Sequence, residues 1–157
     1  MLSKIFPAHY DDVYRGHKFA LVLLVFITIF NTIMWYQSVF NTYYAAAEAD
    51  NIPLASYPAD AALQIISIFA KLGNVHFIFI VLSVLALIRY RSMISLVFLL
   101  QIWEYVTRLA INNHLHDTPW VSLPGDLAQA IVQSLFYAML LGFALSLWHR
   151  DRSASPS

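Results

Sequence analysis

The chain has 157 residues, of which 60% are hydrophobic and 11% are charged, and its mean hydropathy is +0.64. This composition lies outside the range of soluble domains and indicates a protein whose solvent is lipid. The nine basic and nine acidic residues cancel without forming a basic run, which excludes a nucleic-acid-binding protein, and the absence of cysteine excludes disulfides, thiol chemistry and cysteine metal sites.

The N-terminal segment, residues 1–18, places apolar and aromatic side chains near one helical face over residues 2–14, with Pro7 interrupting the pattern. Two interpretations stay open for this segment. It forms a short helix at the cytoplasmic membrane surface, or it is a frayed tail.

Four apolar segments follow, and each is long enough to cross about 30 Å of hydrocarbon, which takes about 20 helical residues. They are expected at about 19–40, 61–88, 93–111 and 127–148 within a membrane domain of residues 19–148. Prolines interrupt the two longer connections, whereas Arg89–Ser92 is a tight hairpin. The sequence therefore predicts an all-α integral membrane four-helix bundle, antiparallel and up-down-up-down, followed by a disordered cytoplasmic tail at 149–157.

The distribution of Lys and Arg predicts the orientation, because cytoplasmic loops retain positive charge. Seven of the nine basic residues lie before the first span, in the hairpin or after the fourth span. The loops at 41–60 and 112–126 contain none. Both termini are therefore expected in the cytoplasm and both longer loops outside it, in a multi-pass protein of the plasma membrane.

Each span carries one stripe of polar residues at helical spacing. The four stripes are Thr28, Asn31, Trp35 and Ser38; Gln64, Ser67, Lys71 and Asn74; Gln101, Glu104, Arg108 and Asn112; and Asp126, Gln129, Gln133 and Tyr137. At about 1.5 Å per residue the stripes begin near the midplane and continue into the outer half. They predict a polar pocket in the outer half of the bundle, above an apolar inner half.

The members expected to bind a ligand in this pocket are Asn31, Trp35, Lys71, Asn74, Gln101, Glu104, Arg108, Asn112, Gln129, Gln133 and Tyr137. An ionised residue facing lipid costs about 2.5–3.5 kcal/mol, so Glu104 should face inward and be paired. Lys71 and Arg108 are its expected partners. The same network is also consistent with a purely structural role, in which it fixes helix register and the two cations extend toward the outer headgroups.

Histidines offer a second kind of site. His114, His116 and Asp117 form an HxH-D element that could hold zinc or copper, although a solvated loop is the simpler interpretation. Bis-histidine haem ligation needs two facing histidines inside the spans, and His76 is the only one well inside. His76 is therefore expected to be a hydrogen-bonded packing residue, and no cofactor is assigned.

The chain resembles small four-helix inner-membrane proteins of bacteria, of the DoxX-like type, in three features. These are Tyr14-Arg15-Gly16-His17-Lys18 before the first span, Arg89-Tyr90-Arg91 in the hairpin, and a third span with Glu104 and Arg108. The resemblance implies a four-helix bundle in a bacterial inner membrane, and it brings no catalytic assignment.

Three functions are compatible with these features. The leading hypothesis is a binding or accessory protein whose pocket takes an amphiphile, such as a lipid headgroup or a quinone, or a partner subunit. The alternatives are an enzyme acting on a lipidic substrate, with Glu104 as acid or base and Arg108 orienting the substrate, and a small-solute transporter. A chain of this size is expected to form a homo-oligomer or to join a larger membrane complex.

Overall fold

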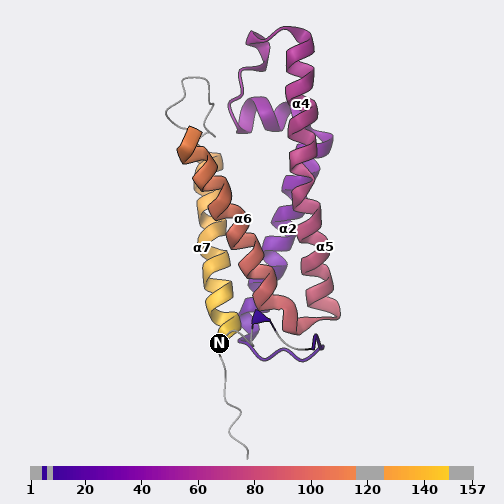
Figure 1. The fold of residues 1–157 in the computed structure, drawn as a ribbon, viewed down its shortest axis with the longest axis vertical. Helices are drawn as coiled ribbons and strands as arrows, with labels where there is room; N and C mark the ends of the chain where they lie inside the picture. The colour runs from indigo at the N-terminus through magenta and orange to yellow at the C-terminus, as the bar shows by residue number, and fades with distance from the viewer. Residues whose placement is uncertain (1–4, 7–8, 116–125, 149–157) are drawn as a thin grey trace, which may run out of the picture.

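The fold is all-α, and the computed structural model describes residues 5–6, 9–115 and 126–148. Within these residues four helical stretches are long and apolar enough to cross a membrane. Their bounds are Lys18–Phe40, Ala59–Ile88, Arg91–Leu115 and Leu127–Leu147. The helices pack together, most closely in the lower half of Figure 1, which confirms a multi-pass membrane protein with a helical bundle.

The first stretch is one helix, α2 (Lys18–Phe40), and the last is α7 (Asp126–Leu147). The second is divided into α4 (Ala59–Gly73) and α5 (Val75–Ile88), with Asn74 between them. The short turn η3 (Arg91–Met93) leads into α6 (Ile94–Leu115). The sequence-based bounds were close for α2 and α7, but α6 continues to Leu115, a full turn past residue 111, since no proline or glycine lies between residues 111 and 115.

Consecutive membrane stretches run in opposite directions (Figure 1). Helix α2 packs against α5 and α7, and α6 also packs against α5 and α7. We call the end with the α5–α6 turn the hairpin end and the opposite end the loop end. At the loop end α4 extends past α6 (Figure 1), and the connection between α2 and α4 folds beside it.

Tight packing is concentrated at the hairpin end. The buried apolar cluster consists of Ala20, Leu24, Ile27, Ala86, Ile94, Val97, Phe98 and Met139, which come from all four spans. Gly142 allows α7 to approach α6, since a Cβ at this position would stand 2.4 Å from the Phe98 ring. Van der Waals contact of this kind holds helices together in lipid, where burial alone gives little driving force.

Residues 9–17 cross the hairpin end as a non-helical strap; of the residues 2–14 considered for an interfacial helix, Ile5 is helical whereas 9–14 are not. The Asp11 backbone N–H donates to Ser92 Oγ (2.9 Å), and this hydroxyl donates back to the Asp11 carbonyl (3.1 Å). The His17 N–H donates to the Leu145 carbonyl (3.0 Å). Arg15 forms an ion pair with Asp11, which lowers the Asp11 pKa. The strap is therefore attached to both the hairpin and α7.

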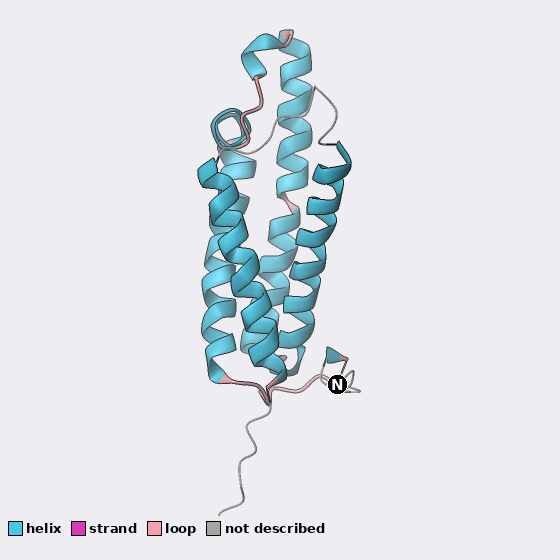
Figure 2. Cartoon of the chain, turned by 90° about the vertical axis from the view of Figure 1, so that its left-hand side faces the viewer, coloured by secondary structure: helices cyan, strands magenta, loops and turns pink. Residues whose placement is uncertain are grey.

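The connection at the loop end is also ordered. It contains α3 (Thr42–Tyr44), the π-helical turn η1 (Ala45–Ala49) and the 3-10 turn η2 (Leu54–Ser56). Asn51 takes a positive φ of 52°, a conformation that asparagine tolerates better than most residues, and it allows the chain to reverse. Figure 2 shows this connection beside the upper part of the bundle.

Candidate polar site

A chain of buried hydrogen bonds joins α2, α5 and α6 in the middle of the bundle. Asn31 Nδ2 donates to Gln101 Oε1 (3.2 Å), and Gln101 Nε2 donates to Ser83 Oγ (3.5 Å). Asn31 Oδ1 lies 3.3 Å from His76 Nδ1, and because an amide oxygen only accepts, this bond requires the proton on Nδ1. Asn31 is 7% exposed and Gln101 is 2% exposed. These residues form a buried polar network that spans three helices.

One turn closer to the loop end, Trp35 connects α2 to the break in the second span. Its Nε1 donates to Asn74 Oδ1 at 3.4 Å. The Asn74 N–H bonds back to the carbonyls of α4, while its own carbonyl accepts from Phe77 in α5. Gly73 packs directly on Ser38, where a Cβ would stand 2.3 Å from the Ser38 Cβ. The break thus lets α4 lie close against α2.

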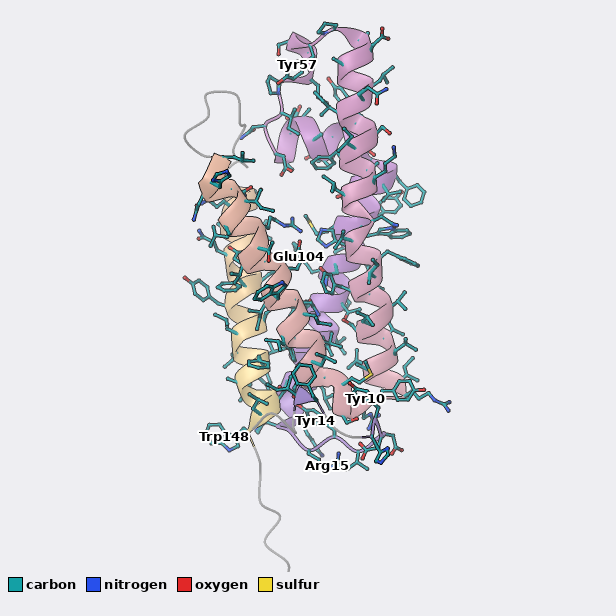
Figure 3. The ribbon with its side chains drawn as sticks, viewed as in Figure 1. Tyr10, Tyr14, Arg15, Tyr57, Glu104 and Trp148 are labelled. Atoms are coloured by element: carbon teal, nitrogen blue, oxygen red, sulfur yellow. The ribbon has the colours of Figure 1, made fainter. Side chains whose placement is uncertain are left out.

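Glu104 and Arg108 form an ion pair along α6, one and two turns above Gln101 on the same face. Arg108 Nε donates to Glu104 Oε1 at 3.1 Å, and Arg108 Nη2 makes a second short contact to the same oxygen. The Arg108 side chain is 46% exposed and the Glu104 side chain is 30% exposed. In Figure 3 Glu104 lies between the ribbons of α6 and α2, where the two helices diverge.

The connection between α2 and α4 brings a third charged group near this pair. Burial raises the pKa of Asp50, and the positive charge of Arg108 opposes this rise. His76 also lies within electrostatic range of Arg108 and Glu104. The loop carboxylate, the ion pair and the upper end of the buried network therefore occupy one region at the loop end, which we call the loop-end site.

The sequence predicted Lys71 as a partner of Glu104, but Lys71 lies outside the loop-end site. Within the described ranges, ion pairs connect Arg108 to Glu104 and Arg15 to Asp11, and Lys71 is exposed on α4. By helical phase it lies opposite Gly73, the residue that faces α2. The Glu104–Arg108 part of the predicted network is present, and Asn112 lies one turn beyond it, half-buried.

The polar stripe on the fourth span also lies outside the loop-end site. Gln129, Gln133 and Tyr137 are exposed, and Tyr137 is 67% exposed. The face of α7 that enters the bundle carries Leu135, Met139 and Gly142 instead. A regular stripe shows which residues share a face, but it does not say which face meets the bundle. Gly142 was the sequence signal that could have decided this.

Two of the three predicted metal ligands, His116 and Asp117, lie outside the described residues, and His114 is exposed near the end of α6. Among the residues that are described, no group of three His, Asp or Glu side chains is arranged to hold a metal ion. The sequence correctly indicated a hydrogen-bonded His76. It did not single out Ser83 or Asp50, since a lone serine in an apolar helix and a loop carboxylate give no periodic signal.

A comparison with models of protein families, with curated proteins and with solved structures gave no match. The similarity to DoxX-like proteins therefore stays an expectation from sequence patterns. The sequence and the fold together identify a small four-pass membrane protein with a buried polar network.

Proposed function

We propose that this protein binds the polar headgroup of an amphiphile, a lipid or a quinone, at the loop-end site. The observation that supports this most is the incomplete use of Arg108. Both of its hydrogen bonds go to one oxygen of Glu104, so, among the described residues, Nη1 and the second carboxylate oxygen have no hydrogen-bond partner. Guanidinium groups bind carbonyl, carboxylate and phosphate oxygens through such free donors.

The depth of the pair fits a headgroup. Arg108 lies about 21 Å along α6 from the hairpin end, at about 1.5 Å per residue. This is about two thirds of the way across a hydrocarbon layer of roughly 30 Å. A headgroup drawn slightly into the bundle from the nearer leaflet would reach Arg108, while its apolar tail stays in lipid.

The close packing at the hairpin end supports a binding protein over a transporter. The hairpin end is filled by buried aliphatic and aromatic side chains and covered by the strap of residues 9–17. A solute moving through the bundle would have to displace this cluster, including Phe98 and Leu24. A ligand that enters and leaves at the loop end does not.

The proposal is tested by the amphiphiles that copurify with the protein in a mild detergent, identified and counted by native mass spectrometry. We expect about one tightly held molecule per chain in the wild type and at least a tenfold loss in Arg108→Gln. Arg89→Gln is the matched control, because it removes the same charge from the exposed hairpin end, where Arg89 lies 5.8 Å from the Tyr90 ring centre. Equal retention by the two variants, with both folded by circular dichroism, would contradict the proposal.

A further inference from the structure

The outward face of α7 carries a polar stripe that no part of the described bundle covers. Met139 belongs to the buried apolar cluster and Leu135 packs against it, so these two residues mark the inward face of α7. At about 100° per residue, Gln133 and Tyr137 each lie about 160° around the helix from Leu135. Gln129 lies about 120° away on the same side as Gln133. All three side chains are exposed.

Gln133 is deep within the span. It lies about 21 Å along α7 from the hairpin end, well inside a hydrocarbon layer of about 30 Å. Within the described chain, the side-chain amides of Gln129 and Gln133 form no hydrogen bond, whereas the nearby Ser134 hydroxyl is satisfied by the Ala130 carbonyl at 2.8 Å. An amide without a partner in hydrocarbon is costly, so a group from outside the described part of the chain is needed.

We propose that this stripe is the contact surface of a homodimer, in which α7 packs in parallel against α7 of a second copy. A carboxamide both donates and accepts, so a glutamine is complementary to itself. A two-fold axis along the membrane normal places Gln133 opposite its own equivalent at the same depth in both copies. Any other partner helix would have to supply a hydrogen-bonding side chain independently at this depth.

The remainder of the same face suits close helix packing. Toward the hairpin end it continues as Leu140, Leu141 and Ala144, all of them exposed. Ala144 is small enough to let two backbones approach, and the leucines provide apolar contact beside it. A lipid headgroup is a poor alternative occupant, because Gln133 is as deep as Arg108 but has a shorter, uncharged side chain that cannot extend toward the outer edge of the hydrocarbon as a guanidinium can.

Cysteine crosslinking tests the proposal directly, because the chain contains no cysteine. Ala144→Cys, on the same outward face, keeps Gln133 in place. It is oxidised in native membranes with copper phenanthroline and compared with Val22→Cys, an exposed residue of α2 at a similar distance from the hairpin end. We expect a disulfide-linked dimer of twice the chain mass for Ala144→Cys, at a yield at least fivefold above that of Val22→Cys. Equal yields, or capture of a different protein by Ala144→Cys, would overturn the proposal.

Energy transfer between labelled copies in lipid vesicles provides a second readout without oxidation. We expect Gln133→Leu to weaken self-association at least threefold and Gln133→Asn to retain most of it, because only the latter keeps an amide. Wild-type association no stronger than that of Gln133→Leu would refute the proposal. The α7 stripe is separate from the loop-end site, so neither result depends on whether an amphiphile binds Arg108.

Discussion

The buried bond between Asn31 and Gln101 makes a quantitative prediction. Gln101→Leu removes the acceptor of Asn31 Nδ2 and the donor to Ser83 Oγ, and it leaves the Asn31 N–H buried without its partner. Leaving a buried donor unsatisfied costs about 1–3 kcal/mol. Interhelical hydrogen bonds in membranes average only about 0.6 kcal/mol and reach about 1.7 kcal/mol, because the unfolded chain also finds partners. Gln101→Leu breaks two such bonds and leaves a buried donor unpaired, so we expect it to reduce stability by about 1–3 kcal/mol.

A double-mutant cycle separates this bond from other effects of the substitution. Asn31→Leu combined with Gln101→Leu should be less destabilising than the sum of the single variants, by about 0.6–1.7 kcal/mol. The assay is equilibrium unfolding in mixed micelles, followed by circular dichroism at increasing fractions of a denaturing detergent. Gln133→Leu is the matched control, and in monomeric micelles it should change stability by less than about 0.5 kcal/mol. Additivity within about 0.3 kcal/mol, or equal effects of Gln101→Leu and Gln133→Leu, would refute the assigned network.

Three further predictions concern other parts of the structure. Gly142→Ala places a methyl group against the Phe98 ring, so it should lower the free energy of unfolding in the same micelles by about 1–3 kcal/mol. An unchanged unfolding midpoint would show that α6 and α7 are not in close contact at this position. Burial raises the pKa of Tyr14 to about 12, so the stability that depends on its neutral phenol holds below pH 10 and falls as the pH rises toward 12. The difference in 295 nm absorbance between wild type and Tyr14→Phe should titrate near pH 12, and a midpoint near 10 would contradict the burial. Burial raises the pKa of Asp50, so the ionised carboxylate opposes folding at neutral pH. Asp50→Asn should therefore be more stable than wild type at pH 7, and this difference should disappear below pH 4, where the carboxyl group is protonated. A loss of stability at pH 7 would instead show that the carboxylate is held by a partner.

The helices could be predicted because apolar length is a strong signal in a membrane protein. The expected first and fourth spans, 19–40 and 127–148, agree with α2 and α7 to within one residue at each end. The break at Asn74 has a weaker signal. Gly73-Asn74 is a poor helical pair, but only the contacts to Ser38 and Trp35 show that the break has a packing function.

The candidate site was predicted in part, and the reason lies in what helical spacing encodes. Asn31, Gln101, Glu104 and Arg108 share faces that meet inside the bundle, as their spacing indicated. Gln133 and Lys71 follow equally regular stripes but lie on faces turned away from the neighbouring helix. Which face enters the bundle depends on shape complementarity, such as Gly142 against Phe98 and Gly73 against Ser38, and this cannot be read from polarity alone.

The central claim is that the loop-end site holds a polar headgroup, and an experimental density map of protein extracted gently from its native membrane tests it most directly. We expect density for a headgroup within hydrogen-bonding distance of the Arg108 guanidinium, beside Glu104 and between α6 and α2. A map in which side chains fill that region and Arg108 is fully satisfied by Glu104 and other groups of the chain would contradict the claim.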